Sequence, residues 1–380
     1  MNELDVNFGL VSAAVTAVTL AAAAVAPTRN QMQKVGNLVD VLENVVNVLN
    51  DQDESFLGNV FDPAAVLDSL RKDGWVIGPD EQDLHEFFLV LLNTIDEHLT
   101  GKPEPSLKDV FEAPIPKFPG EIPSKTRHTF SGIESNDAKI AGLVGLERPF
   151  RGLMASQLMC TCCGKRTALK HDSFSSVSLA FPGNNPGMYF ARTNLMELLR
   201  GYFASDVVHD VLCGHCSSLA GDGASVRRVF VKDTYMGKLP KCLCLHIQRT
   251  RWLPDGRAIK CSFPVDFSEY LDLEEFVFTP RSSRLRSVQP EPVKAKTLAS
   301  LVKSASIDQT PSTVFQLKAV VEHLGDTAAG HFVTYRRGPI GSQSRDLWFY
   351  TSDTRVQPTS RSHVFQAIPY ILFYERVSAG

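Results

Sequence analysis

Residues 330–335, GHFVTY, place a glycine directly before a histidine and then continue as a β-branched and aromatic run. This composition predicts a β-strand that carries the imidazole at its first residues. Glycine allows the backbone to turn tightly just before the strand. His331 is therefore expected at a strand end, where a general base can be aimed at a substrate.

A second stretch, residues 348–356 with the sequence WFYTSDTRV, predicts another aromatic strand that ends in a hydroxyl and a carboxylate side by side. Either Ser352 or Asp353 would accept the second imidazole N–H and fix the tautomer of His331. The two stretches together predict two of the three members of a catalytic triad. The nucleophile is the member that they do not supply.

The composition sets broad limits on the function. The chain has 380 residues, enough for one large domain or two ordinary ones, with 39 basic against 42 acidic residues. With these charges nearly balanced, the chain has no strong positive electrostatic potential to attract nucleic acid, and its sequence contains no basic tail that could do so locally. We therefore expect no nucleic-acid partner, and a zinc-dependent nucleic-acid module is disfavoured.

All eight cysteines lie between Cys160 and Cys261. Two C-x-x-C pairs in a long, otherwise cysteine-poor chain indicate a reduced compartment and a metal rather than a disulfide framework. Each pair presents two thiolates to one tetrahedral ion, so the two pairs predict one structural zinc ion that joins the ends of two hairpins. The alternatives are unligated buried thiols or a redox pair. The expected ligands are Cys160, Cys163, Cys213 and Cys216.

Other sulfur and imidazole groups are assigned structural roles. Cys162 is expected to be a spectator, and His215 would be a substitute ligand that four sulfurs do not need. Cys242 and Cys244 share one face of an alternating strand, where free cysteine is usually a small packing residue rather than a nucleophile. His246 on the same strand is expected to be a satisfied core histidine.

The N-terminus predicts a membrane anchor, which we assign to residues 1–34 with its flank. Residues 6–28 contain no charge, and Arg29 and Lys34 follow. Such a segment is long enough to span a bilayer, and the positive C-terminal flank would keep the remaining chain in the cytoplasm. The alternative is an Ala-rich buried helix.

Helical periodicity follows from residue 34 to about 110, with helices expected over residues 63–72 and 81–99. Strand-like alternation then dominates, most clearly at 239–249, 314–321 and 370–374. Residues 279–311 are rich in Ser, Arg, Lys and Pro, which predicts a disordered loop inside the domain. This order of elements indicates an α+β fold.

Several motifs carry a family resemblance in a consistent order. They are QDLHEFF at 82–88, F-x-G at 150–152 before the first C-x-x-C, the second C-x-x-C, LPKCLCLHIQR at 239–249, VVEHLGDTAAGHFVTY at 320–335, W-x-x-x-S-D-x-x-V at 348–356 and AIPYILFYERV at 367–377. From about residue 35 to 377 the chain resembles the ubiquitin-specific protease family of cysteine deubiquitinases. Within that family it is most similar to the member of the mitochondrial outer membrane.

The resemblance implies a papain-like hand, with a catalytic domain over residues 35–378 behind the N-terminal anchor. The thumb, which is helical and truncated here, would cover about 35–135, and zinc-binding β fingers would cover 145–235. The β palm would be formed by 236–278 and 313–378, interrupted by a disordered insertion at 279–312.

The resemblance also implies the site roles and the partners. His331 would be the general base, Ser352 the residue that orients it, and Asp353 an auxiliary charge. The implied reaction is thiol-dependent hydrolysis of ubiquitin isopeptide bonds on mitochondrial outer-membrane proteins, with the catalytic domain in the cytosol. Ubiquitin, ubiquitinated membrane proteins and the membrane itself are the implied partners.

The sequence departs from the family pattern in one respect, the nucleophilic cysteine. The family places its nucleophilic cysteine in a block resembling G-L-x-N-x-G-N-x-C-x-x-N before the thumb helices, whereas no cysteine precedes Cys160 here. Isopeptide hydrolysis of this type needs an activated thiolate. We therefore expect a splice form or an incomplete gene sequence that is inactive as written. The alternative is a non-catalytic ubiquitin-binding protein.

Overall fold

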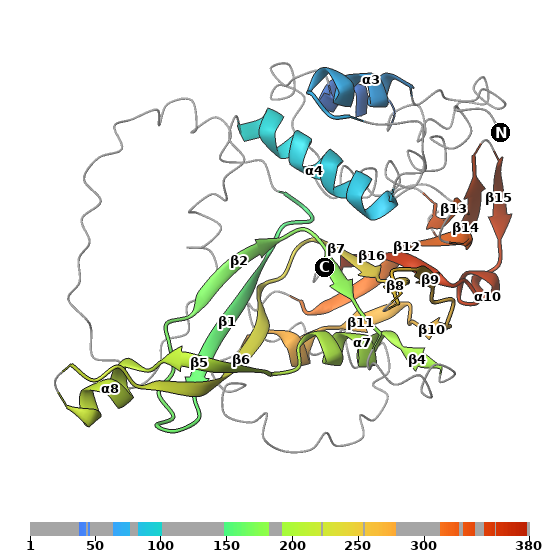
Figure 1. The fold of residues 1–380 in the computed structure, drawn as a ribbon. Helices are drawn as coiled ribbons and strands as arrows, with labels where there is room; N and C mark the ends of the chain where they lie inside the picture. The colour runs from blue at the N-terminus through green and yellow to red at the C-terminus, as the bar shows by residue number, and fades with distance from the viewer. Residues whose placement is uncertain are drawn as a thin grey trace. The chain divides into compact units, whose positions relative to one another are not determined.

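The computed structural model shows a chain that divides into two compact units, drawn in Figure 1. The first unit contains Met1–Pro105, Ile115–Pro149 and Lys318–Ala367, and the second contains Ser106–Pro114, Phe150–Leu317 and Ile368–Gly380. The structure describes residues 38–42, 45, 64–76, 83–100, 148–181, 192–221, 223–253, 255–278, 312–326, 330–338, 346–353 and 355–377.

The helices of the first unit agree with the periodicity of the sequence. Helix α3 covers Ala64–Lys72 and helix α4 covers Leu84–Thr100. The carboxylate of Asp83 accepts hydrogen bonds from the backbone N–H groups of His85 and Glu86 at 2.8 and 3.0 Å. Asp83 is thus the N-cap, so α4 begins three residues later than position 81, where we predicted its start.

The first unit contains β13, β14, β15 and the larger part of β12, which form an antiparallel meander in the order β15-β14-β13-β12. The register pairs Leu324 with His331 between β12 and β13, and Thr334 with Thr351 between β13 and β14. A short helix, α10, follows β15. The bounds are β12 Val314–Gly325, β13 Gly330–Arg337, β14 Trp348–Ser352, β15 Arg355–Thr359 and α10 Arg361–Val364.

The second unit contains a four-stranded antiparallel sheet in the order β2-β1-β6-β5. Its two hairpins, β1–β2 and β5–β6, are joined where β1 pairs with β6 along Leu153–Cys160. These are the long green and yellow strands of Figure 1. The bounds are β1 Gly152–Cys160, β2 Lys170–Phe174, β5 Asp206–Leu212 and β6 Arg227–Lys238.

A run of three paired strands in this unit has the order β16-β7-β3, with β7 antiparallel to β16 and parallel to β3. Its strands are almost completely buried, as their continuous apolar runs require. The elements are β3 Val177–Leu179, β7 Cys242–Ile247, β16 Pro369–Arg376, the short strands β4 Thr193–Asn194, β8 Thr250–Trp252, β9 Ala258–Lys260, β10 Val265–Asp266 and β11 Tyr270–Asp272, the helices α7 Leu195–Tyr202 and α8 Gly214–Ala220, and the 3-10 turn η4 Glu274–Phe276.

Several sequence predictions fall on other parts of the chain. The predicted anchor at residues 1–34 and the predicted disordered insertion at 279–312 lie outside the described residues, apart from Ser312. Among the helices that the structure describes, none has the length and apolar character needed to cross a bilayer.

Candidate functional site

His331 occupies the second position of β13, directly after Gly330. The glycine is required by its neighbour, because a Cβ atom added to Gly330 would meet His323 Nε2 at 1.9 Å and the carbonyl oxygen of Leu324 at 2.6 Å. His323 in turn packs against Phe332 with ring centroids 4.7 Å apart. The strand that carries the imidazole therefore approaches β12 so closely that only glycine fits.

The register of β13 and β14 brings Ser352 to the imidazole. Thr334 and Thr351 are directly paired, so His331 and Ser352 lie on the opposite face of the sheet as diagonal neighbours. His331 Nε2 lies 2.9 Å from Ser352 Oγ. The hydroxyl oxygen can accept a hydrogen bond from the Nε2–H group, which would leave Nδ1 as the basic nitrogen.

Asp353 places a carboxylate beside this pair. Its Oδ2 atom lies 3.6 Å from His331 Nε2, and its backbone has a φ of 46°. Aspartate is one of the few residue types that adopt this left-handed conformation readily. The other carboxylate oxygen, Oδ1, is buried and has no hydrogen-bond partner within the described part of the chain. The carboxylate is therefore oriented toward the imidazole by the turn that follows β14.

The imidazole of His331 remains accessible, with about a third (36%) of its side chain exposed. Among the described residues, His331 makes polar contacts with Ser352 and Asp353, and both contacts involve its Nε2 atom. Nδ1 thus stays available to take a proton from an incoming thiol or hydroxyl group. The geometry provides a base and two groups that can orient it.

No cysteine belongs to the unit that contains this base. The eight cysteines all belong to the second unit, whereas His331 belongs to the first. Cys242 and Cys244 are buried on β7, and burial raises the pKa of Cys244 far above its usual range. These two thiols are packing residues, as the sequence predicted.

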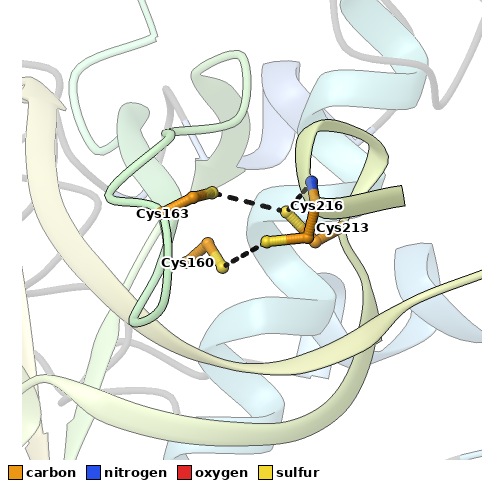
Figure 2. Close-up of side chains that lie close together, drawn as sticks. All are labelled: Cys160, Cys163, Cys213 and Cys216. Atoms are coloured by element: carbon orange, nitrogen blue, oxygen red, sulfur yellow. Dashed lines mark hydrogen bonds between the residues drawn. The ribbon is translucent and has the colours of Figure 1, made fainter. Parts of the chain in front are cut away.

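The four predicted zinc ligands converge in the second unit, as Figure 2 shows. The Sγ atoms of Cys160 and Cys216 are 4.0 Å apart, those of Cys163 and Cys213 are 3.6 Å apart, and all four lie within 4.8 Å of one another. A tetrahedral zinc ion with Zn–S bonds of about 2.3 Å separates its sulfurs by about 3.8 Å. The donor set fits zinc in both number and spacing.

Local structure explains why the sulfurs meet. Cys160 ends β1, and Cys213 is the N-cap of α8, where its Sγ accepts the backbone N–H of Cys216 at 3.5 Å. A hydrogen bond from the backbone of Cys163 lowers the pKa of Cys160 to about 7, whereas burial raises the pKa of Cys216. The prediction that the four ligands converge from the ends of two hairpins is confirmed, although the second knuckle opens a helix instead of a plain hairpin turn.

Neighbouring residues take the roles expected of them. Cys162 is exposed and lies outside the cluster, and His215 is likewise exposed and does not contribute. His246 makes a hydrogen-bonding contact of 3.1 Å with Ser178 through Nδ1, so it is a satisfied, half-buried histidine. The sequence did not predict the left-handed turn at Asp353, although a Ser-Asp pair after a strand is a turn signal.

Comparison with known proteins gives consistent results. Residues 14–374 match the family described as ubiquitin carboxyl-terminal hydrolase, and this match begins inside the segment that we assigned to the anchor. Ubiquitin carboxyl-terminal hydrolase 30 of Homo sapiens is 30% identical over 376 residues, which cover 84% of this chain and 71% of that protein. The protein of the same name from Xenopus tropicalis is 28% identical over 385 residues, covering 90% of this chain and 72% of its own.

A solved structure shares the fold. The SAGA Ubp8/Sgf11/Sus1/Sgf73 DUB module bound to ubiquitin aldehyde includes a chain that matches with a TM-score of 0.63 at 17% identity, covering 100% of this chain and 69% of that one. The papain-like α+β hand expected from the motifs is the fold that this likeness supports. Because the family match extends over nearly all of its length, this chain belongs to the ubiquitin carboxyl-terminal hydrolase family.

Proposed function

We propose that the protein acts in thiol-dependent hydrolysis of ubiquitin isopeptide bonds, and that its nucleophilic segment is missing from the sequence as written. The observation that carries the proposal is the 2.9 Å contact between His331 Nε2 and Ser352 Oγ, because it leaves Nδ1 as the nitrogen that can act as a base. In a member of this family, an imidazole held in that way is suited to activating a cysteine thiol.

The proposed chemistry assigns each group one task. Nδ1 of His331 takes the proton of the thiol, the thiolate attacks the isopeptide carbonyl, and the same nitrogen returns the proton to the departing lysine amine. Water then hydrolyses the thioester with His331 acting again as base. Ser352 accepts a hydrogen bond from the Nε2–H group, and the carboxylate of Asp353, whose Oδ2 lies 3.6 Å from Nε2, interacts favourably with the imidazolium that forms.

The fingers have a different role in this proposal. A zinc ion bound by Cys160, Cys163, Cys213 and Cys216 would tie the β1–β2 and β5–β6 hairpins together. The ion would be structural because four sulfurs fill its coordination sphere and leave no open position for water or substrate. Ubiquitin would be held by the sheet that these hairpins form.

The first test measures hydrolysis of a fluorogenic ubiquitin substrate. The chain as written should give a rate equal to the uncatalysed background, because it has a base but no thiol for that base to activate. Turnover that His331→Ala abolishes would contradict this expectation, whereas turnover that persists in His331→Ala would indicate a contaminant.

The second test examines the transcripts and genomic DNA that encode residues 28–36. We expect an alternative exon or unread segment that encodes a cysteine, and a protein that includes this segment should hydrolyse the substrate. Absence of any cysteine codon between the N-terminal segment and the thumb helices would reject the missing-segment proposal.

A non-catalytic ubiquitin-binding protein is the second candidate. It is favoured by the contrast between a complete four-sulfur site and a base without a thiol. Titration with ubiquitin should then give saturable binding that is lost when zinc is removed, and a flat isotherm would reject this function.

We further propose that residues 1–34 anchor the protein in the mitochondrial outer membrane, with residues 35–378 in the cytosol and ubiquitinated membrane proteins as substrates. The support is the charge-free run at residues 6–28 followed by Arg29 and Lys34. A reporter fused to residues 1–35 should resist carbonate extraction from mitochondria. A reporter released into the soluble fraction would contradict the anchor.

A further inference from the structure

A zinc ion bound by the four cysteines would place a negative charge inside the protein. Four thiolates and one Zn²⁺ ion carry a net charge of about −2, and Cys160, Cys213 and Cys216 are buried. A buried charge is costly unless hydrogen-bond donors or opposite charges compensate it. Metal ligands are accordingly held by an outer layer of groups that contact the ligand atoms rather than the metal.

The backbone supplies some of these donors. The Sγ atom of Cys213 accepts the backbone N–H of Cys216 at 3.5 Å, and the sulfur of Cys160 accepts hydrogen bonds from the backbone of Cys163 and Cys162. These donors belong to the knuckles themselves and carry no formal charge. They therefore leave the net negative charge of the complex unbalanced.

Arg228 lies on the face of the chain that packs against the cysteines. Side chains two residues apart share a face of an extended segment, and Val226 and Phe230, on either side of Arg228, both pack in the cluster around the sulfurs. Val211, which is directly paired with Arg228, packs in the same cluster. The register thus directs a largely exposed, positively charged side chain toward the zinc ligands.

The first knuckle is fixed to β6 directly beside this arginine. The carbonyl oxygen of Val229 accepts hydrogen bonds from the backbone N–H and the hydroxyl of Thr161 at 3.0 and 2.8 Å. The pKa of Arg228 is raised, chiefly because its guanidinium donates a hydrogen bond to the sulfur of Cys216. Arg228 therefore reaches a ligand of the second knuckle while the adjacent residue holds the first.

A neighbouring arginine is directed to another partner. The Nη1 atom of Arg227 donates to the backbone carbonyl and the carboxylate of Asp210 at 2.6 and 3.1 Å. Arg227 and Arg228 are adjacent on β6, carry the same charge and are both exposed. They differ in that the guanidinium of Arg228 contacts a sulfur, so Arg227 provides a matched control.

We propose that Arg228 is a positioning residue of the zinc site, whose guanidinium donates to the Cys216 thiolate and tightens the binding of zinc. The inference rests on the structural zinc ion that the proposed function assigns to the fingers. A hydrogen bond from a cation balances part of the charge of the complex and holds the sulfur in the direction that the metal requires.

The test measures the zinc affinity of the full chain by competition with a chromogenic chelator. Arg228→Gln should bind zinc about 10–100-fold more weakly than the parent chain, which is the range for loss of an outer partner of a metal ligand. Arg228→Lys should recover part of this loss, because it keeps the charge without the planar fork. Arg227→Gln, which removes an equal charge from the adjacent position, should keep the parent affinity.

Cobalt substitution gives a readout that a general loss of stability would not change. Co²⁺ in a four-sulfur site shows sulfur-to-metal charge-transfer absorption, whose energy depends on the hydrogen bonds made to the sulfurs. Arg228→Gln should move this absorption to lower energy, because a thiolate without its cationic donor gives up an electron more easily. Arg227→Gln should leave the absorption unchanged.

Three results would overturn the role of Arg228 and leave the metal site intact. Parent zinc affinity in Arg228→Gln would mean that the guanidinium does not support the ligand. Equal weakening in Arg228→Gln and Arg227→Gln would assign the effect to the general charge of the strand. Weaker binding with an unchanged charge-transfer absorption would assign it to folding. A parent chain that binds no zinc would instead reject the four-sulfur site, and the role of Arg228 with it.

Discussion

The four-cysteine cluster and the His331 site are both assembled from segments distant in sequence, but only the first is complete. Cys160 and Cys163 meet Cys213 and Cys216 within 4.8 Å, and together they fill the coordination sphere of a zinc ion. His331 meets Ser352 and Asp353, and the mechanism proposed above also requires a thiol. A metal site can be judged complete from its ligands, whereas a catalytic site must be judged by the group that it is arranged to activate.

The largest effect is expected from breaking the complete site. Cys213→Ser removes one thiolate and should lower the zinc content from about one ion per chain to nearly none. The free energy of unfolding should fall by on the order of 5 kcal/mol, because binding energy in such sites is folding energy. Metal analysis and chemical denaturation measure both quantities. Cys162→Ser, an exposed neighbour outside the cluster, is the control and should keep its zinc. Full zinc content in Cys213→Ser would contradict a four-sulfur site.

A smaller loss of stability is expected from Gly330→Ala beside the histidine. The new methyl group would lie 1.9 Å from His323 Nε2 and 2.6 Å from a backbone carbonyl, so one of the strands must move. We expect a loss of about 2–3 kcal/mol in the free energy of unfolding, measured by denaturation. Gly201→Ala, in helix α7 with no heavy atom within 4 Å, is the matched control and should be neutral or stabilising by up to about 1 kcal/mol. Equal effects in the two variants would show that β12 and β13 do not approach so closely.

The next largest loss of stability is expected from the buried polar pair Tyr335 and Glu322, which lies in the sheet that carries His331. The hydroxyl of Tyr335 donates to the carboxylate of Glu322 at 3.3 Å, and burial is the main cause that raises the pKa of Tyr335 well above its usual range. Tyr335→Phe should cost about 1–2 kcal/mol at neutral pH.

The raised pKa also predicts a pH dependence. The unfolded tyrosine ionises near pH 10 while the folded one stays neutral, so its contribution to stability is full below about pH 10 and is lost as the pH rises further. Denaturation across that range should show a shallower decline for Tyr335→Phe than for the parent chain. Identical slopes would mean that Tyr335 does not titrate differently in the folded state.

The smallest effect on stability is expected for Ser352→Ala. The hydroxyl is only half-buried, so the change in the free energy of unfolding should stay within about 0.5 kcal/mol. The tautomer of His331 should change instead, because the acceptor at Nε2 is lost. Nitrogen-15 NMR of the imidazole measures this, and Ser362→Ala on α10 serves as the control. An unchanged tautomer would mean that Ser352 does not orient the base.

The zinc site was predictable from the sequence because ligand type and spacing determine the coordination chemistry. The C-x-x-C pairs specified four donors, and folding only had to bring two short turns together. The long strands were also predictable, since β7 and β13 follow alternating or β-branched runs. Helix α4 was placed correctly except for its start, which the Asp83 cap determines.

Features that depend on register were not predictable in the same way. The strand pattern alone left both Ser352 and Asp353 as candidates, and the family resemblance pointed to Ser352. The pairing of Thr334 with Thr351 is what brings Ser352 within 2.9 Å of the imidazole. The contact between Gly330 and His323 likewise arises from strand pairing, which periodicity does not specify.

Because His323 approaches Gly330 so closely, retention of the two residues Gly330 and His331 has two different evolutionary explanations. Selection for a folded sheet would be enough to keep that glycine, even in a lineage that had stopped hydrolysing anything. His331 is different, because its half-exposed ring could be replaced at little cost to folding. If descendants of this chain vary at position 331 but keep glycine at position 330, the variation would show when hydrolysis was lost. The unchanged glycine would show only that the protein still folds.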